Sequence, residues 1–366
     1  IKNVYVTPDV AGKEAIMRFD VNAVEAGTYT LRITAKDNAF PAVTAVIELN
    51  GDAQQVTMAV AVPEPKLWSP ESPFLYDFIV ELEAPDGQID HLESYFGMRT
   101  VERAQWGENP YEYILLNGEP VYLRGALDQA FHPDGLHTYP SDDVIRGDIQ
   151  LAKDLGLNML RCHIKMNDPR YYYWADRLGL LVMYDIACAD LDTPEMRRMY
   201  EAALPRTIAR DFNSPSIFAW VLFNETWGLT EHHMPNASSH QWVTGMVART
   251  KALDPTRLVE DNSPCHYDHV TGDINSWHFY INDYPQVRKH IRQVVDSTYP
   301  GSGFNYVGDY VQDTAPLMNS EYGGIAAKSG DLDIAWCFKY QTSELRRYSK
   351  ICGCLLYTSD AADERG

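Results

Sequence analysis

The first hundred residues alternate apolar and polar side chains with a period of two, which is typical of half-buried β-strands. Examples are the runs EAIMRFDV, GTYTLRITAK, TAVIELN and FLYDFIVELEA. Turn-forming sequences separate the runs, among them NGD at 50–52 and PDG at 85–87. This part of the sequence has no helical period. The pattern predicts an antiparallel β-sandwich of the immunoglobulin type over residues 1–103.

From residue 111 the pattern changes. The sequence YEYILLNGEPVYLRG contains two strand-like runs around Asn117-Gly118, a dipeptide that favours a tight hairpin turn. Strands and helices alternate after it. Ser141 can cap a helix over 142–155, and the pair Asp168-Pro169 can begin another. We expect Gly156 and Gly179 to end these two helices, because glycine commonly follows the last helical residue.

Continuous apolar strands between helices indicate a parallel sheet that helices cover on its outer face. The predicted strands are 121–126, 158–164, 180–186, 216–224, 257–262, 273–280, 315–321 and 350–357. Eight strands in roughly 250 residues favour a (β/α)8 TIM barrel over residues 104–366. An open, doubly wound sheet is the alternative, but no GxGxxG sequence follows any of these strands.

The two ends of the sequence depart from this plan. The tail CLLYTSDAADERG, residues 354–366, resembles a translated sequencing adaptor more than a barrel loop and helix. We therefore expect the barrel to be incomplete at its C-terminal end. The sequence begins at Ile1 without Met, so it offers no targeting segment to interpret.

Charge and composition limit the partners. The chain carries 51 Asp and Glu against 31 Lys and Arg, a net charge of −20, which would repel nucleic acid and anionic membranes. No run approaches the roughly 18 apolar residues of a membrane span. The six cysteines show no paired spacing, so free thiols are expected. These features predict a soluble protein of the cytoplasm or periplasm, without indicating an oligomeric state.

Polar residues recur where the predicted strands end, and barrel enzymes carry their chemistry at the carboxyl ends of strands. They are Asp128, Gln129, Arg161, His163, Asp185, Asn224, Glu225, Asp261, Asn262, His278, Tyr280 and Glu321. Two of them, Glu225 in AWVLFNETWG and Glu321 in APLMNSEYGG, end strongly apolar strands, where a carboxylate is costly unless it is paired or used. Strands four and seven face each other across a closed barrel. Two facing carboxylates are the equipment of glycoside hydrolysis.

Five segments resemble glycoside hydrolase family two, the retaining family of β-galactosidases, β-glucuronidases and β-mannosidases. They are FGMRTVE at 96–102, LNGEPVYLRGA at 116–126, NMLRCHI at 158–164, FNETWG at 223–228 and NSEYGG at 319–324. The sequence LWSPESPFLYDF at 67–78 is similar to the immunoglobulin-like domain that precedes the barrel in this family.

The resemblance implies a retaining exo-β-glycosidase that hydrolyses terminal β-linked sugars through a covalent glycosyl-enzyme intermediate. It favours β-galactosides as substrates, with β-glucuronides or β-mannosides as alternatives. A different interpretation is a barrel that binds carbohydrate without turning it over.

The resemblance also implies roles for single residues. Glu225 matches the acid/base of the family and Glu321 matches its nucleophile. Asn224 matches the asparagine that binds the sugar 2-hydroxyl. Arg161 resembles an arginine beside the nucleophile, whose charge would keep Glu321 ionised. Trp227 would contribute to the low-dielectric surroundings that keep Glu225 protonated.

Four further positions are candidates for substrate binding. Tyr280 matches a tyrosine close to the nucleophile, although His278 could make that contact instead. His163 is either a core histidine or a substrate ligand, and its place near Arg161 favours the ligand. Asp128 and Gln129 could hold sugar hydroxyls or could belong to an ordinary polar loop.

No metal or other cofactor is expected. Family members that use magnesium carry Glu-x-His after strand three, and the sequence YDIACADLD lacks it. The histidines of EHHM at 231–234 and HYDH at 266–269 lie in polar stretches and are more typical of solvated side chains than of zinc ligands. The β-glucuronidases carry Asn-x-Lys after the nucleophile, whereas Lys328 has no Asn two residues before it, which weakens that alternative.

Overall fold

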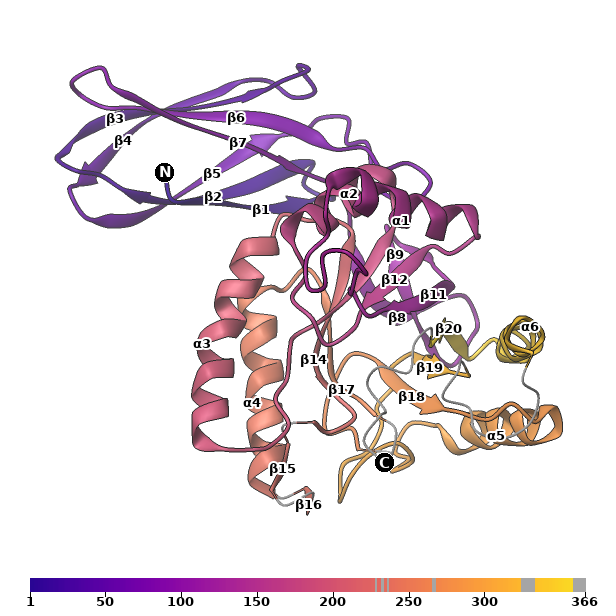
Figure 1. Cartoon of the computed structure of the whole chain (residues 1–366). Coiled ribbons are helices and arrows are strands. Elements are labelled where there is room, and N and C mark those ends of the chain that lie inside the picture. Colours follow the sequence, from indigo (N-terminus) through magenta and orange to yellow (C-terminus); the bar gives the residue numbers. More distant parts are fainter. Residues whose placement is uncertain (228, 232–233, 236, 265–267, 324–332, 358–366) are drawn as a thin grey trace. The chain divides into compact units, whose positions relative to one another are not determined.

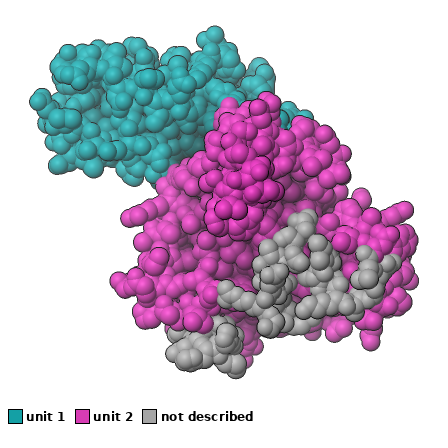
Figure 2. Space-filling view, in the orientation of Figure 1, with its two compact units in different colours: residues 1–100, 176–179, 211–215 teal, residues 101–175, 180–210, 216–366 magenta. Residues whose placement is uncertain are grey.

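A computed structural model describes residues 1–366 except 228, 232–233, 236, 265–267, 324–332 and 358–366. The chain divides into two units, which Figure 2 shows in different colours. The first unit contains residues 1–100, 176–179 and 211–215, and the second contains the rest of the chain. The sequence-based boundary between residues 103 and 104 falls inside the short strand β8, Val101–Gln105, of the second unit.

The first unit is an antiparallel sandwich of two sheets, as the alternating pattern predicted. One sheet has the order β1-β2-β5 and the other the order β4-β3-β6-β7. The strands are β1 (Asn3–Asp9), β2 (Glu14–Asn22), β3 (Ala26–Ala35), β4 (Val43–Asn50), β5 (Ala53–Ala61), β6 (Tyr76–Glu83) and β7 (Ile89–Phe96). Along β2, Met17 and Phe19 are buried in the core while Arg18 between them is exposed. Alternate residues of each strand therefore build the core.

The second unit is a nearly closed barrel of eight parallel strands, the fold class predicted from the sequence (Figure 1). In sheet order the strands are β17 (Leu258–Ser263), β14 (Ile217–Asn224), β13 (Leu181–Asp185), β12 (Met159–Cys162), β11 (Leu123–Asp128), β20 (Ile351–Leu356), β19 (Leu317–Tyr322) and β18 (Asn275–Phe279). Each of the eight predicted strands overlaps one of them. The two end strands of this order, β17 and β18, are in contact.

Helices connect most of the successive barrel strands. They are α1 (Asp142–Asp154), α2 (Pro169–Leu178), α3 (Pro194–Asp211), α4 (Ala237–Leu253), α5 (Tyr284–Ser297) and α6 (Ile334–Leu345). In Figure 1, α3 and α4 run alongside β14 and β17. The connection from β17 to β18 is different, because its described residues form no helix. This connection is about as short as the shortest crossovers that join parallel strands.

Local sequence signals set several element boundaries as expected. Ser141 caps α1, with its hydroxyl accepting from the backbone N–H of Val144. The hairpin of β9 (Glu112–Leu116) and β10 (Glu119–Pro120) turns through Asn117 and Gly118, both at positive φ, as a tight hairpin turn requires. A further short hairpin pairs β15 (Thr230–Glu231) with β16 (Met234–Pro235).

The predicted adaptor-like tail lies partly in the barrel. Cys354–Leu356 form the second half of β20 and pair with β11 and β19, while residues 358–366 lie outside the described part of the chain. The described cysteines, at 162, 188, 337, 352 and 354, are free thiols. Among the described residues, no helix combines the length and apolar character that crossing a membrane requires.

The sandwich core predicts a large difference between two apolar positions. Leu31 on β3 is 0% exposed, and Val46 on β4 is 69% exposed. Leu31→Ala should lower the free energy of unfolding by about 2–5 kcal/mol, because it leaves a cavity between the sheets. Val46→Ala should change it by less than about 0.5 kcal/mol. Denaturant unfolding of both variants measures the difference, and equal effects would contradict the burial of Leu31.

Candidate active site

The carboxyl ends of the parallel strands bring polar side chains together at one end of the barrel. β12 supplies Arg161, β14 leads to Asn224 and Glu225, β18 supplies His278, and β19 supplies Glu321. Contacts of 3.5 Å or less link these five side chains. They were predicted from the strand ends, and the barrel places them in one cluster.

Glu321 lies in surroundings that favour an ionised carboxylate. Its Oε1 is 3.2 Å from Nη1 of Arg161, 3.3 Å from Nε2 of His163 and 3.5 Å from Nε2 of His278. The hydroxyl of Tyr280 donates to its other oxygen. Burial alone would raise the pKa of the Glu321 carboxyl, but His278, His163 and Arg161 outweigh burial and hold this pKa well below its usual range.

Glu225 has different neighbours and more access to solvent. Its side chain is 15% exposed, against 2% for Glu321. Its Oε1 lies 2.7 Å from Nδ1 of His278 and 3.3 Å from the hydroxyl oxygen of Tyr280. Tyr280 therefore reaches both acids.

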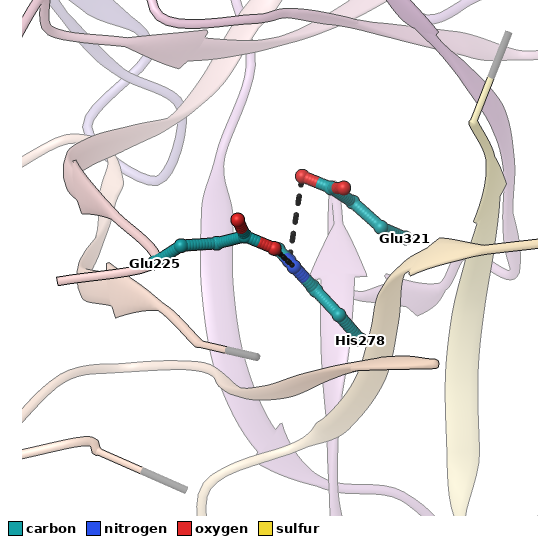
Figure 3. Close-up of side chains that lie close together, drawn as sticks. All are labelled: Glu225, His278 and Glu321. Carbon is teal, nitrogen blue, oxygen red and sulfur yellow. Dashed lines mark hydrogen bonds and ion pairs between the residues drawn. The ribbon is translucent and has the colours of Figure 1, made fainter. Parts of the chain in front are cut away.

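The imidazole of His278 lies between the two carboxylates (Figure 3). Its Nδ1 faces Glu225, while its Nε2 faces Glu321 and is 2.9 Å from the hydroxyl oxygen of Ser263. A neutral imidazole carries one N–H donor, so it can donate to only one of the two acids at a time. Only the protonated ring can donate on both sides. The sequence left Tyr280 and His278 as alternative contacts of Glu321, the predicted nucleophile, and the structure brings both side chains to Glu321.

The backbone turns sharply where the buried strand β14 reaches Glu225. Glu225 has φ of 48° and Thr226 has φ of 66°, in the left-handed region that L-residues rarely adopt. Such a conformation costs roughly 1–2 kcal/mol per residue. The strand before the turn is buried throughout, from Ile217 to Asn224, which fixes the point from which the turn departs. Strained backbone of this kind is concentrated at functional sites in proteins.

Arg161 is fully buried and its charge is balanced by carboxylates. Asp185, the last residue of β13, binds it through both carboxylate oxygens at 2.9–3.1 Å. Arg161 also donates to Oδ1 of Asn224 at 2.7 Å and to Glu321. Burial alone would lower the pKa of the Arg161 guanidinium, but Asp185 and Glu321 raise it. The sequence pointed to Asp185 through its place at a strand end but gave it no role.

Two of the remaining candidates, Gln129 and Trp227, lie next to residues of the cluster. Oε1 of Gln129 lies 3.0 Å from Nδ1 of His163, whose other ring nitrogen faces Glu321. Gln129 therefore orients a histidine at the site. Trp227 is half-buried in the turn after Glu225, where its backbone N–H donates to the carbonyl oxygen of Asn224. Its predicted effect on Glu225 stays a prediction.

Asp128 has mainly local contacts. One of its carboxylate oxygens accepts from the backbone N–H of Ala130 at 2.7 Å, and the other is 3.5 Å from the hydroxyl of Tyr139. Burial raises the pKa of this carboxyl. These contacts stabilise the loop after β11, so they agree with the polar-loop alternative for Asp128.

The cluster also contains a set of groups that a metal could use. Among the described residues, one oxygen or nitrogen each from Glu225, His278 and Glu321 lie within 4.8 Å of one another. Magnesium prefers oxygen ligands, whereas a mixed nitrogen and oxygen set suits zinc or a similar metal. A metal there would bind both carboxylates and block their predicted use as acid and nucleophile. The expectation that no metal is needed stays a prediction.

The histidines of the polar stretches have different outcomes. His232, His233 and His266 lie outside the described residues. His269 does not fit the expectation of a solvated side chain, because it is buried with Nδ1 2.7 Å from Oδ1 of Asp261. The polar residues around it in the sequence concealed this partner, which is eight positions earlier. The pair ties the β17–β18 connection to the end of β17.

Comparisons with known proteins agree with this geometry. Residues 1–99 match the model of glycosyl hydrolases family 2, and residues 110–350 match the TIM barrel domain of glycosyl hydrolases family 2. The chain is 33% identical over 313 residues to a β-galactosidase of Psychromonas ingrahamii, with 81% of this chain and 27% of that protein covered. It is 35% identical over 214 residues to a putative β-glucuronidase of Formosa agariphila, with 56% of this chain and 19% of that protein covered.

Solved structures with the same fold include a β-galacturonidase of Eisenbergiella tayi bound to galacturonate. Its TM-score is 0.79 at 20% identity, with 97% of this chain and 64% of that chain covered. A β-glucuronidase of Bacteroides uniformis has a TM-score of 0.77 at 21% identity, with 97% and 45% covered. At these identities the likeness shows the fold.

The chain spans less than a third of the length of the two curated relatives described. The two family models, however, match successive parts of it, and the barrel model alone covers more than half of the chain. The chain therefore belongs to glycosyl hydrolase family 2.

Proposed function

We propose that this chain carries the catalytic centre of a retaining exo-β-glycosidase whose substrates are β-galactosides. The observation that carries the proposal is the close approach of the two acids, because carboxylate oxygens of Glu225 and Glu321 lie within 4.8 Å of each other. Retaining glycosidases hold the two carboxyl groups about 5–5.5 Å apart, whereas inverting enzymes separate them by about 6.5–9.5 Å to admit a water. The separation supports direct attack by one carboxylate on the sugar.

The surroundings of the two acids support their different roles. Arg161 and two histidines surround Glu321, and its low pKa keeps it ionised at neutral pH, as a nucleophile requires. In the first step an oxygen of Glu321 bonds to the anomeric carbon. The bond from that carbon to the leaving oxygen breaks, and Glu225 donates its proton to that oxygen.

The second step reverses these roles. Glu225, now ionised, takes a proton from water as the water oxygen bonds to the anomeric carbon. The ester bond to Glu321 breaks, the sugar leaves with its original configuration, and both acids return to their starting states. Glu225 is the more exposed of the two carboxyls, which supports its role as the acid that water reaches.

The hydroxyl of Tyr280 can donate to whichever of the two acids carries the negative charge at each step. While Glu321 is ionised, the hydroxyl of Tyr280 donates to it. When Glu321 is an ester, the charge resides on Glu225, which lies 3.3 Å from the same hydroxyl. Asn224 accepts from Arg161 through Oδ1, so the group that it offers to a sugar hydroxyl is its amide nitrogen, a donor.

The choice of β-galactoside is supported by the β-galactosidase of Psychromonas ingrahamii, which matches 81% of the chain. The putative β-glucuronidase of Formosa agariphila keeps β-glucuronides as an alternative, and β-mannosides are a second. Lys328, on which the sequence argument against a glucuronidase depends, lies outside the described residues. The contacts of Glu225 and Glu321 with His278 and Tyr280 support turnover over a barrel that only binds carbohydrate.

A panel of p-nitrophenyl β-glycosides tests the substrate class on the protein that carries this chain. We expect the β-galactoside to be hydrolysed with the highest kcat/KM, ahead of the β-glucuronide and the β-mannoside. If the β-glucuronide or the β-mannoside is hydrolysed fastest, that sugar replaces β-galactoside as the assigned substrate. Sugar binding without hydrolysis of any member would favour the non-catalytic alternative.

Variants of the two acids test their roles. Glu225→Ala should keep its first step on substrates with good leaving groups, because these need little protonation, and added azide should restore turnover with a β-glycosyl azide product. Glu321→Ala should lose nearly all activity on every substrate, because no covalent intermediate can form. Product analysis by NMR separates the anomers. An α-glycosyl azide from Glu225→Ala would exchange the two assignments.

The low pKa of Glu321 predicts a contribution to stability that depends on pH. A carboxyl with a lower pKa in the folded state stabilises the fold above its unfolded pKa, about 4.3, and this contribution is lost as the pH falls towards the folded pKa. Glu321→Gln removes the contribution, so its free energy of unfolding should fall less steeply than that of the wild type between about pH 5 and pH 3. Denaturant titrations across this range measure both slopes. Parallel curves would contradict an ionised Glu321.

A further inference from the structure

The turn that carries Glu225 is held from the neighbouring strand β17. The backbone N–H of Glu225 donates to the carbonyl oxygen of Ser263 at 2.8 Å, and the N–H of Thr226 donates to Oδ1 of Asn262 at 3.1 Å. Within the turn, the N–H of Trp227 donates to the carbonyl oxygen of Asn224. Two of these acceptors are backbone atoms, and the third belongs to the side chain of Asn262.

Asn262 is well placed to act on the turn. It is 1% exposed and lies opposite Phe223 in the register of β14 and β17, next to the pair of Asn224 and Ser263. The sheet thus fixes the backbone of Asn262 opposite Phe223, which is two residues before Glu225. The side chain reaches beyond the end of the ladder and binds the first N–H that the ladder does not satisfy.

We propose that Asn262 is a positioning residue that holds the left-handed turn of Glu225 and Thr226 and so aims the acid/base at the leaving group. Two consecutive L-residues with φ of 48° and 66° persist only where the surroundings fix them. Without the acceptor on Asn262, Thr226 can return to an ordinary negative φ. This change redirects the chain on the C-terminal side of Glu225 and loosens its carboxyl from His278.

The proposal rests on the proposed function, because it assumes that Glu225 is the acid/base. General acid catalysis needs the proton within hydrogen-bond reach of the leaving oxygen. Displacement of Glu225 should therefore slow the departure of poor leaving groups, which need the proton, and should hardly affect good ones. A general loss of stability would instead lower activity on all substrates alike.

The test measures kcat/KM of the protein that carries this chain on aryl and alkyl β-glycosides of one sugar with leaving groups of increasing pKa. Asn262→Leu removes the acceptor at similar volume, and Asn262→Asp keeps an acceptor oxygen. Asn275→Leu is the matched control. Asn275 is also a buried asparagine of a barrel strand, but it lies at the start of β18 and its side chain binds those of Asn305 and Gln312. Glu225→Ala in the same series tests the proposed function itself.

For Asn262→Leu we expect a loss on the order of 10²-fold on alkyl glycosides, as for a displacement of about 1 Å, and less than about threefold on dinitrophenyl glycosides. Asn262→Asp should lose less on the alkyl glycosides. Thr226→Gly added to Asn262→Leu should restore part of the loss, because glycine adopts positive φ without strain.

Two results would overturn the proposal. One is an equal loss on all leaving groups in Asn262→Leu, with thermal destabilisation like that of Asn275→Leu. The other is no loss in Asn262→Leu while Glu225→Ala shows the expected dependence on the leaving group. If Glu225→Ala itself shows no such dependence, the assignment of the acid/base fails first and the proposal fails with it.

Discussion

A guanidinium that is removed from water must be paired with a carboxylate and hydrogen-bonded, and this requirement at Arg161 organises the carboxyl end of the barrel. Arg161 on β12 joins Asp185 on β13, Asn224 on β14 and Glu321 on β19. Loss of Asp185 would leave the guanidinium with Glu321 as its carboxylate partner, and loss of Glu321 would leave it with Asp185. Glu321 is thus a structural counter-ion as well as the proposed nucleophile, and its low pKa follows from the same contacts.

The same arrangement explains why the two proposed catalytic acids can differ while they lie so close together. Glu321 projects from β19 towards the Arg161 guanidinium, two imidazoles and the Tyr280 hydroxyl, while Glu225 is the first residue after β14 and lies on a turn. His278 and Tyr280 contact both, so the two acids compete for the same donors. Both acids depend on strands for their placement, and strands hold side chains with less freedom than loops do.

The sequence revealed most of this framework because its signals are local. Apolar runs bounded by glycine, proline and capping residues located all eight barrel strands, and acids at the ends of apolar runs indicated Glu225 and Glu321. The contacts that depend on barrel closure were not visible. Asp185 and Arg161 are 24 positions apart, and the sequence does not show which strand-end carboxylate binds the guanidinium.

Contacts between residues that are close in the sequence explain two other residues whose surroundings the sequence did not settle. The carboxylate of Asp128 accepts from the N–H two residues later, a turn contact that is typical of aspartate and that agrees with the polar-loop alternative. His269 is buried with its Nδ1 2.7 Å from Oδ1 of Asp261, although both lie in a polar stretch. Polarity in the sequence therefore identified residues that avoid the apolar core, but it did not distinguish solvated side chains from buried, paired ones.

Because Glu225 has a left-handed backbone conformation, the residue type that best suits thermal stability at this position differs from the one proposed for activity. Glycine, or to a lesser degree asparagine, adopts such a conformation with less strain than glutamate does. Either would also relieve the crowding of two carboxylates within 4.8 Å. Selection for a higher melting temperature alone would therefore favour replacement of Glu225, whereas selection for turnover would retain it as the proposed acid/base. Directed evolution of this fold for thermal stability needs an activity screen at every round to keep its acid.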